Sequence, residues 1–547
     1  MIRINQLKIP ITNETVTQNR LRKEAADFLR IDSRQIVNLS IYKKSLDARK
    51  KPSLFWIYSL DVTLTDPRKE EEILSPRCRK KYKNNVLPAK FSAYQMPEKL
   101  SGKIPSDQRP VIIGTGPAGL FCGYLLSLLG FCPILIERGL PVEERKAKVE
   151  QFWNNNTLDK DCNIQFGEGG AGTFSDGKLQ TQVKDPYGRI RKVLEIFVSH
   201  GAPEEILYLN KPHIGTDILA DVIVSMRKDM ISRGAEFHFS TCFDEFMIAG
   251  NTVKGICVSK TDGSRHEIKA GAVVLAPGHS ARDTFETLLR QDVFMENKPF
   301  AVGYRVLHPQ HLINKAQYGE NYKELNLPAA DYKLTYSATS GRGVYSFCMC
   351  PGGYVVNASS EVGMLAVNGM SYHKRDSDTA NSAIVMTVSE EDYGKNLLDG
   401  MRFQRDLEKR AFEKGDGWMP AEKCVDFVNG TFSPEQPMPK AVKGGTKAAE
   451  LRGILPESME RDFCEAMLHF NEIIPGFLGE EAAMIAVESR TSSPVKIVRG
   501  DNMQSNIAHL FPCGEGAGYA GGITSAAIDG LKVAEKIVML YNNESFS

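Results

Sequence analysis

VIIGTGPAGLFCGYLLSLLGFCPILIER, residues 111–138, decides the fold of this chain. It reads as an apolar strand, a glycine-rich turn, a helix and a second strand. Gly114 permits a tight turn, Gly116 lets a phosphate group approach the backbone, and Gly119 allows the helix to pack closely against the strand. Glu137, 18 residues beyond the last of these glycines, is placed to accept hydrogen bonds from ribose hydroxyls. The stretch therefore predicts an α/β unit that binds a dinucleotide.

The pattern G-x-G-x-x-G occurs twice more, at 167–172 and at 516–521. The first of these follows no apolar strand and precedes no helical pattern. The other follows an apolar strand, but no second strand with a ribose-binding acid comes after it in this sequence. We therefore predict one nucleotide site built from three glycine-rich segments.

Two further apolar strands end in short turns, AVVLAPG (272–278) and LFPCGEGAG (510–518). Together with the first turn, they resemble the large FAD-dependent oxidoreductases of the glutathione-reductase structural type. This resemblance implies FAD, with Glu515 at the position of the Asp that binds the ribityl chain. It also implies a helix after Gly521 whose N-terminal amides face the flavin, where negative charge develops on reduction.

The residues expected to contact FAD lie in the turns and strand ends of these segments. They are Gly114, Gly116, Pro117, Ala118, Gly119, Glu137, Arg138, Gly169, Gly170, Gly172, Thr173, Ser175, Asp176, Lys178, Ala276, Gly278, Gly514, Glu515, Gly521, Gly522 and Ile523. Lys178 either contacts a phosphate or N1 of the flavin, or belongs to a solvated turn.

Several longer segments carry a more specific resemblance. They are GEGGAGTFSDGKL (167–179), KPHIGTDIL (211–219), VGYRVLHPQ (302–310), CMCPGGYVVNASSE (348–361), ESRTSSPVKI (488–497) and CGEGAGYAGGITSAAIDG (513–530). Over nearly the whole chain the sequence resembles an uncharacterised family of bacterial FAD-dependent dehydrogenases with a small α+β domain ahead of the flavoprotein body.

The expected fold class is α/β. A discontinuous Rossmann-like FAD-binding domain carries an inserted mixed α+β substrate or cap domain and an N-terminal ferredoxin-like α+β domain. The expected boundaries are 1–86 for the N-terminal domain, 87–108 for a linker, 109–296 and 481–547 for the two parts of the FAD domain, and 297–480 for the cap.

Composition predicts an ordinary cytoplasmic protein with no membrane partner, because no apolar run is long enough for a signal or an uninterrupted span. Its eleven cysteines form no C-x-x-C pair, so we expect reduced thiols and no metal site. Residues 1–108 carry 22 Lys and Arg against 12 Asp and Glu. This charge favours a solvated surface, and the alternative is a grip on RNA by Lys43, Lys44, Arg49, Lys50 and Lys51 around one loop.

Four residues are candidates for catalysis. Arg490 either binds a substrate carboxylate or the reduced flavin, or forms a structural ion pair. His213 is either a general acid or base or a cap of the helix expected to start at Asp217. Cys348 and Cys350 would share one face of a strand, which favours structural or substrate-lining thiols over a redox pair.

The predicted function is a FAD-dependent oxidoreductase that transfers hydride or electrons between a small-molecule substrate and bound FAD. The lack of a second intact nucleotide fold in the sequence argues against a built-in NAD(P)H domain. NAD(P)H as a donor would therefore dock transiently on the flavin face. The alternatives are a FAD-dependent protein that modifies or binds RNA, and a flavin-binding sensor or scaffold without turnover.

Overall fold

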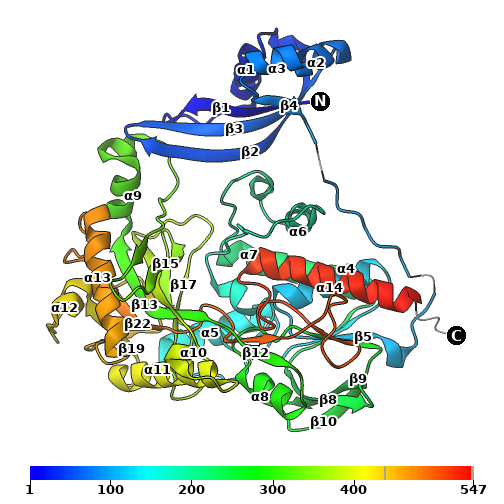
Figure 1. The fold of residues 1–547 in the computed structure, drawn as a ribbon, viewed down its shortest axis with the longest axis vertical. Helices are drawn as coiled ribbons and strands as arrows, with labels where there is room; N and C mark the ends of the chain where they lie inside the picture. Colours follow the sequence, from blue (N-terminus) through cyan, green and yellow to red (C-terminus); the bar gives the residue numbers. More distant parts are fainter. Residues whose placement is uncertain (91, 101, 437–438, 544–547) are drawn as a thin grey trace.

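The computed structural model describes residues 1–547 except 91, 101, 437–438 and 544–547. The first two of these lie in the expected linker, and the last four lie at the end of the expected FAD domain. The chain forms a mixed α/β structure in which a small N-terminal unit stands apart from a larger body (Figure 1). Among the described residues, none of the helices has both the length and the apolarity to cross a bilayer.

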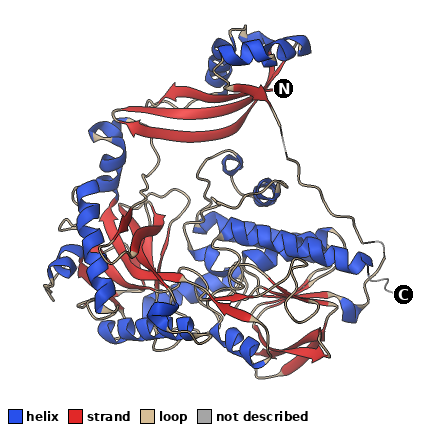
Figure 2. Ribbon diagram, viewed as in Figure 1, coloured by secondary structure: helices blue, strands red, loops and turns tan. Residues whose placement is uncertain are grey.

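The N-terminal unit is a four-stranded antiparallel sheet in the order β2-β3-β1-β4, with helices on one face (Figure 2). Its elements are β1 (Ile2–Pro10), α1 (Gln18–Leu29), β2 (Ile36–Lys50), β3 (Ser53–Leu64), α2 (Pro67–Leu74), α3 (Pro76–Lys81) and β4 (Val86–Pro88). Apolar side chains of β1 and β3 pack on Leu21, Ala25 and Leu29 of α1. β4 pairs with β1 as far as Pro88, so this sheet extends two residues past the boundary expected at 86.

The basic residues expected around one loop lie elsewhere. Lys43, Lys44, Arg49 and Lys50 belong to the long strand β2, and the connection to β3 is a tight turn at 51–52. The alternation of polar and apolar residues extends the strand through what composition alone suggested was a loop.

Strand β2 also joins the N-terminal unit to the body. The backbone N–H of Lys44 donates to the Tyr208 carbonyl at 2.7 Å, and the N–H of Asn210 donates to the Lys44 carbonyl at 2.8 Å. The Lys51 ammonium donates to the Ala316 carbonyl. The edge strand of one sheet is thus covered by a loop of the other unit, which satisfies backbone groups that an open edge leaves to solvent.

The first layer of the body is a five-stranded parallel sheet, β24-β11-β5-β6-β7. Its strands are β5 (Pro110–Ile113), β6 (Ile134–Ile136), β7 (Glu236–His238), β11 (Ala272–Leu275) and β24 (Leu510–Pro512). One face is covered by α4 (Pro117–Leu128), α6 (Arg189–Ser199), α7 (Thr216–Ser232) and α14 (Ile523–Asn543). The other face is covered by α8 (Arg282–Arg290) and a small sheet of β8 (Thr241–Ala249), β9 (Thr252–Lys260) and β10 (Arg265–Lys269). The short strands β5, β6, β11 and β24 are wholly buried with apolar residues on both faces, as parallel strands between two layers require, whereas the edge strand β7 is partly exposed.

The second layer is a seven-stranded sheet, β14-β15-β18-β13-β22-β19-β21, backed by a helix that runs from Glu457 to Ile473. Its strands are β13 (Phe300–Pro309), β14 (Thr335–Ser337), β15 (Gly343–Cys350), β18 (Thr379–Val388), β19 (Met419–Lys423), β21 (Thr446–Ala448) and β22 (Ala483–Glu488). A three-stranded sheet of β16 (Tyr354–Asn357), β17 (Val367–Met370) and β20 (Val442–Lys443) and a pair of β12 (Met295–Asn297) and β23 (Val495–Ile497) adjoin it. Its helices are α9 (Gln310–Tyr318), α10 (Glu390–Tyr393), α11 (Asp399–Gly415), α12 (Cys424–Asn429) and α13 (Glu457–Ile473).

The boundary expected at 480 cuts through this second layer. β22 pairs with β13 and β19, so residues 483–488 belong to the seven-stranded sheet and not to the returning part of the FAD domain. An apolar strand shows no sign in its own sequence of which sheet it joins, because partner choice depends on contacts far along the chain.

Candidate functional site

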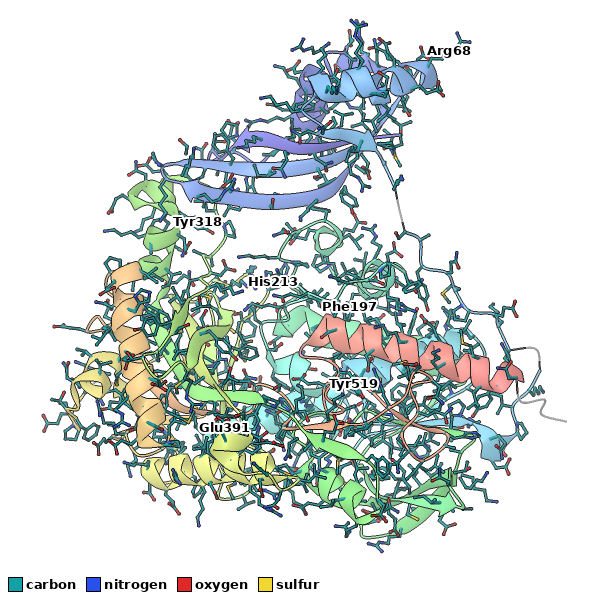
Figure 3. The ribbon with its side chains drawn as sticks, in the orientation of Figure 1. Arg68, Phe197, His213, Tyr318, Glu391 and Tyr519 are labelled. Carbon is teal, nitrogen blue, oxygen red and sulfur yellow. The ribbon has the colours of Figure 1, made fainter. Side chains whose placement is uncertain are left out.

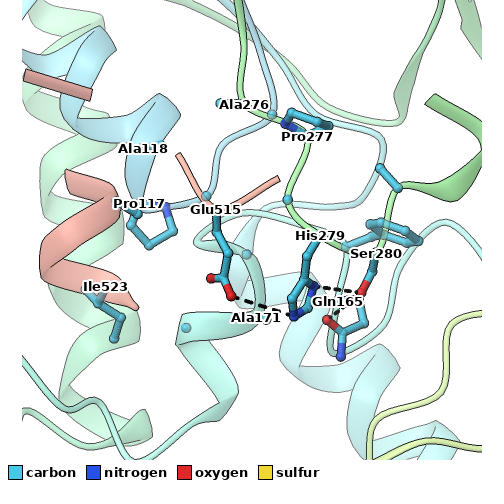
Figure 4. Close-up of a pocket in the computed structure, with 18 of the residues that line it drawn as sticks. Pro117, Ala118, Gln165, Ala171, Ala276, Pro277, His279, Ser280, Glu515 and Ile523 are labelled. Atoms are coloured by element: carbon cyan, nitrogen blue, oxygen red, sulfur yellow. Dashed lines mark hydrogen bonds and ion pairs between the residues drawn. The ribbon is translucent and has the colours of Figure 1, made fainter. Parts of the chain in front are cut away.

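A cavity of about 390 Å³ lies between the five-stranded and the seven-stranded sheet (Figure 4). All three glycine-rich segments contribute to its wall. Of the residues expected to contact FAD, the wall includes Gly114, Gly116, Pro117, Ala118, Glu137, Arg138, Gly170, Gly172, Ser175, Asp176, Lys178, Ala276, Gly278, Glu515, Gly521, Gly522 and Ile523. The remaining four, Gly119, Gly169, Thr173 and Gly514, are not on the wall.

The first glycine turn joins β5 to α4. Gly114 has a φ of +93°, and a Cβ there would lie 2.3 Å from the carbonyl oxygen of Ala276. A Cβ on Gly119 would lie 2.0 Å from the carbonyl oxygen of Gly114. Gly116 has more space around it, because the atom nearest to an added Cβ would be the Cα of Gly170, 3.9 Å away. The outer glycines therefore shape the turn, and the middle one leaves room beside it.

The start of α4 is open to a ligand. Gly116 is the N-cap residue, and no side chain among the described residues caps this helix end. The first amide groups of a helix have no partner within the helix and favour negative charge. This end of the cavity therefore suits an anionic group such as a pyrophosphate.

Glu137 links the first glycine segment to the second. Its Oε2 accepts from the backbone N–H of Thr115 at 3.0 Å and from Thr115 Oγ1 at 2.8 Å. Its Oε1 accepts from the backbone N–H groups of Gly139 at 3.0 Å and Gly167 at 2.9 Å. A carboxylate offers about four acceptor positions, so these donors occupy all of them. A ribose hydroxyl would bind Glu137 only by replacing one of these donors.

The neighbouring Arg138 is held by two contacts. Its Nη2 lies 2.8 Å from a carboxylate oxygen of Asp283, and its guanidinium lies 4.3 Å from the centre of the Phe166 ring. Arg138 therefore forms part of the wall of the cavity with its charge already paired.

The second glycine segment takes its shape from one buried side chain. Arg145, in α5 (Val142–Asn155), is fully buried and donates to five backbone carbonyls, three in this segment and two just before it. The acceptors are Asn163 at 2.9 Å, Ile164 at 2.7 Å, Gly167 at 3.2 Å, Glu168 at 2.7 Å and Gly170 at 2.9 Å. Burial lowers the pKa of Arg145 to about 10, which keeps the side chain charged at neutral pH.

The third segment brings Glu515 to the cavity beside His279 (Figure 4). The Nε2 of His279 lies 4.0 Å from Glu515 Oε1, and Ser280 Oγ donates to Gln165 Oε1 at 3.0 Å. Burial raises the pKa of Glu515 to about 7, although Lys298 opposes it. Burial, with the nearby Arg490 second, lowers the pKa of His279 to about 3. Near neutral pH, His279 is therefore neutral and Glu515 is partly protonated, so this part of the wall can hydrogen-bond to a ligand without a full charge.

Arg490 reaches the cavity wall, but a buried carboxylate occupies its guanidinium. Its Nε and Nη2 lie 2.8 Å and 2.7 Å from the two carboxylate oxygens of Glu408. Arg282 binds the same carboxylate at 2.7 Å and 2.9 Å. Burial alone would raise the pKa of Glu408, but the two guanidinium groups lower it well below its usual value. These contacts are those of a structural ion pair that ties α8 to α11.

His213 does not lie on the wall of this cavity, although its backbone pairs with that of Lys178, which does. It lines a second cavity of about 550 Å³ between the N-terminal sheet and the body, and Figure 3 shows it on the side of the body that faces that sheet. The helix after it begins at Thr216 with Gly215 as N-cap residue, so the expectation that His213 caps this helix is wrong. Burial, with Arg375 second, lowers the pKa of His213 to about 4.

The two candidate cysteines occupy different environments. Cys348 is part of the cavity wall, whereas Cys350 is fully buried behind it. The pairing of β15 with β18 is irregular between Phe347 and Cys350, so the regular alternation expected for these thiols is wrong. Nearby, the Lys178 ammonium donates to the Met349 carbonyl and lies 3.9 Å from Asp176.

Sequence reasoning missed several residues of the site. Arg145 was hidden among the many charged residues of its helix, and no local pattern marks it as buried. His279 directly follows the strand end at 272–278, so a longer motif would have included it. The side of the cavity formed by the seven-stranded sheet and its neighbours, with Phe347, Asn368 and Thr491, has no recognisable motif.

The chemistry of this cavity fits FAD. One end presents uncapped helix amides and bare glycine backbone, which suit a pyrophosphate. A Cβ on Gly278, Gly521 or Gly522 would meet nothing within 4 Å, so their backbone faces open space. Glu515 offers a hydrogen-bonding carboxyl between these regions.

Comparisons with known proteins agree with this fit. Residues 299–491 match the family model described as "FAD-dependent protein, C-terminal domain-like", and residues 1–63 match a "Domain of unknown function (DUF8436)". A protein of Clostridium beijerinckii, named only "Uncharacterized protein", is 42% identical over 545 residues, which cover 98% of each chain.

Solved structures give weaker likenesses. The flavin-dependent brominase Bmp2 is 14% identical over 80% of each chain, with a TM-score of 0.37. The L-proline dehydrogenase from P. horikoshii is 11% identical over 79% of this chain and 94% of that chain, with a TM-score of 0.36. The glycine oxidase from Bacillus cereus is 11% identical over 79% of this chain and 95% of that chain, with a TM-score of 0.34.

Proposed function

Since the chain belongs to an uncharacterised family of bacterial FAD-dependent proteins, we propose that it is a FAD-dependent oxidoreductase acting on a small molecule. Hydride or electrons would pass between that substrate and bound FAD. The observation that carries the proposal is the single cavity on which three glycine-rich segments and residues of the seven-stranded sheet meet.

Each part of the cavity has a role in this proposal. Gly116 and the open start of α4 would hold the pyrophosphate, and Glu137 and Arg138 would flank the adenosine end. Glu515 would accept from, or donate to, the hydroxyls of the ribityl chain, because its raised pKa allows either near neutral pH. The backbone at Gly521 would approach the flavin ring.

Bound FAD supplies a carrier that takes up either a hydride or two single electrons. Helix α14 begins at Ile523, on the wall of the same cavity, and runs for 21 residues. Its N-terminal amides would favour the negative charge that develops as electrons arrive. Its first turn would thereby stabilise the reduced state.

The substrate would lie on the side of the cavity formed by the seven-stranded sheet. Phe347 offers an apolar face there and Asn368 a side-chain amide, whereas the Thr491 hydroxyl is already hydrogen-bonded to the backbone of Ala301. In this proposal the unit built on that sheet is the substrate or cap domain, inserted into a discontinuous FAD domain. The β2-β3-β1-β4 order supports a ferredoxin-like topology for the N-terminal domain.

The contacts of the basic residues favour a small molecule over RNA as substrate. Arg49 is paired with Asp47 at 2.8 Å, and the Lys44 ammonium lies 4.3 Å from the centre of the Trp56 ring, within the second cavity. Both charges already have neighbours, whereas a phosphate-binding surface needs free cations. RNA binding with a steep salt dependence would reverse this preference.

The visible absorption spectrum of the purified chain tests the proposal, followed by anaerobic titration with NADH and NADPH. We expect the absorption bands of oxidised flavin. Bleaching by either nucleotide would identify it as the donor, whereas unbleached flavin would direct the search to oxidisable metabolites. A chain that retains no flavin after incubation with FAD would contradict the proposal, and flavin that no donor reduces would favour a sensor.

A further inference from the structure

Two thiols lie close together where β15 reaches the cavity. Cys348 is on the wall with a φ of +45°, a conformation that residues other than glycine rarely adopt. The bulge that holds it follows Phe347, and regular pairing with β18 resumes at Cys350. The bulge brings Cys350 Sγ within 3.2 Å of the Cys348 carbonyl oxygen, to which it donates. Cys350 Sγ therefore lies beside the backbone of Cys348, and the two thiols are close enough for a hydrogen bond from Cys350 to Cys348.

Two cations flank this pair. The guanidinium of the fully buried Arg305 lies 3.4 Å from the Cys348 carbonyl oxygen and 3.9 Å from Cys350 Sγ. The Lys178 ammonium binds the carbonyl of Met349, the residue between the two cysteines. A site with positive charge on both sides favours a thiolate over a thiol.

The carboxylates that face the pair are themselves neutralised. Glu488 receives two hydrogen bonds from Arg305, the shorter at 2.8 Å, and Asp176 is paired with Arg375. Arg305 is thus shared between Glu488 and the thiols, so the hydrogen bond from Cys350 and the Lys178 ammonium are the main interactions that favour a thiolate at Cys348.

The pKa values of the two thiols are shifted in opposite directions. A hydrogen bond from Cys350 lowers the pKa of Cys348, and Lys178 and Arg305 lower it further. The same hydrogen bond and burial raise the pKa of Cys350 well above its usual value. The thiol on the cavity wall is thus the one that ionises first.

We propose that Cys348 and Cys350 are a redox-active pair, with Cys348 as the attacking and Cys350 as the resolving thiol, and that the substrate is a small-molecule disulfide. The proposal rests on the proposed function, because reduced FAD is the source of electrons. It assigns to the cavity a substrate class that neither the family model nor the relative indicates.

The thiol–disulfide exchange proceeds in two steps. The Cys348 thiolate attacks one sulfur of the disulfide, so a mixed disulfide forms and one thiolate leaves, taking up a proton from solvent. Cys350 then loses its proton and attacks Cys348 Sγ, which releases the second thiol and closes the Cys348–Cys350 disulfide. Bound FAD, once reduced by a nicotinamide donor, would supply the two electrons and two protons that reopen this disulfide as two thiols.

Bis(hydroxyethyl) disulfide, a small neutral disulfide, is the probe for the thiol steps. It is added to the reduced protein, and the peptides that contain Cys348 and Cys350 are then examined by mass spectrometry. We expect the wild type to form the internal disulfide, C350S to stop at a mixed disulfide on Cys348, and C348S to leave Cys350 unmodified. Free thiols in the wild type, or a mixed disulfide that Cys350 fails to resolve, would overturn the proposal.

The electron transfer is read from the flavin spectrum of the FAD-loaded protein, reduced anaerobically before the same probe is added. We expect the flavin bands to return in the wild type but not in C348S or C350S. Flavin that stays reduced in a wild type whose thiols do close would overturn the link to FAD. Protein without flavin contradicts the proposed function alone, because closure of the pair is still read by mass.

Cys132→Ser is the matched control. This cysteine is half-buried, lies outside the cavity wall and is free, as are Cys348 and Cys350. It should behave as the wild type in both experiments. If C132S lost disulfide closure and flavin reoxidation to the same extent as C350S, the effect would not belong to the pair, and the proposal would be overturned.

Discussion

The first and second glycine-rich segments share a sequence pattern and one cavity, yet different interactions hold them. The first, at 114–119, is enclosed by backbone, because a Cβ on Gly114 would meet the Ala276 carbonyl oxygen and one on Gly119 would meet the Gly114 carbonyl oxygen. The second, at 167–172, lies between no such elements, and Arg145 from α5 binds its carbonyls from behind. A repeated glycine pattern therefore shows where the backbone must be bare, but not what holds it in place.

Replacement of Arg145 by Met should cause the largest loss of stability, because it removes the interactions that hold the second segment. The change removes the donor to five buried carbonyls while keeping most of the side-chain volume. Each buried carbonyl left without a partner costs on the order of 1 kcal/mol or more, so the free energy of unfolding should fall by about 4 kcal/mol. Urea unfolding followed by circular dichroism measures this loss.

The control for that measurement is Arg191→Met in α6. Arg191 is exposed and pairs with Glu195 at 2.9 Å along the same helix. Surface substitutions of this kind change stability by within about 0.5 kcal/mol. Equal midpoints for R145M and R191M would show that the second segment holds its shape without the buried arginine.

Substitution of Gly114 should lower the stability of the protein, whereas substitution of Gly116 should lower its affinity for FAD. In G114A the new Cβ would meet the Ala276 carbonyl in a backbone with positive φ, and the free energy of unfolding should fall by about 3 kcal/mol. In G116A the Cβ has space within the protein, so stability should stay near the wild-type value. FAD affinity, measured from the flavin fluorescence, should nevertheless fall in G116A. Equal loss of stability in both variants would contradict the different roles assigned to Gly114 and Gly116.

The sequence was informative where structure is local. The strand, turn, helix and second strand expected within 111–138 follow from apolar patterning and glycine spacing, as do the strands expected at 272–278 and 510–518, and the structure confirms them. The helix that the resemblance implied after Gly521 is present as α14. In each of these elements the residues that decide the conformation are neighbours in the sequence.

Long-range contacts account for what the sequence could not show. The five acceptors of Arg145 lie 18 to 25 residues away from it, and no spacing rule connects them. Strand β22 joins the seven-stranded sheet through β13, which lies far earlier in the chain. The bulge at Cys348 depends on pairing with β18, so the strand pattern alone placed both thiols wrongly.

Glu137 tests whether the two segments are coupled. In E137Q the amide nitrogen would face backbone N–H groups that now donate to a carboxylate oxygen. Losing two such charge-assisted hydrogen bonds should lower the free energy of unfolding by about 2 kcal/mol. Amide hydrogen exchange should speed up at both Thr115 and Gly167. Faster exchange in one segment only would show that the two are held independently.

The smallest expected effect is a pH dependence that belongs to the second segment. Glu168 is fully buried, and its Oε2 accepts from the Val142 N–H at 2.9 Å while Arg227 lies 3.1 Å from its Oε1. Burial raises the pKa of Glu168 from 4.5 to about 7, although both of these contacts oppose the shift. The folded chain thus holds this proton more tightly than the unfolded chain does.

The resulting contribution to stability is complete below about pH 4.5 and is lost as the pH rises through about 7. Between about pH 5 and about pH 8, the free energy of unfolding should therefore fall by on the order of 1 kcal/mol more in the wild type than in E168Q. Glu143→Gln is the matched control, because Glu143 pairs with the same Arg227 but is half exposed. It should keep most of the wild-type dependence on pH, because burial, and not the charge of Glu143, is the main cause of the raised pKa of Glu168. If E168Q and E143Q give parallel curves, the second segment does not depend on a buried carboxyl, and its shape rests on Arg145 alone.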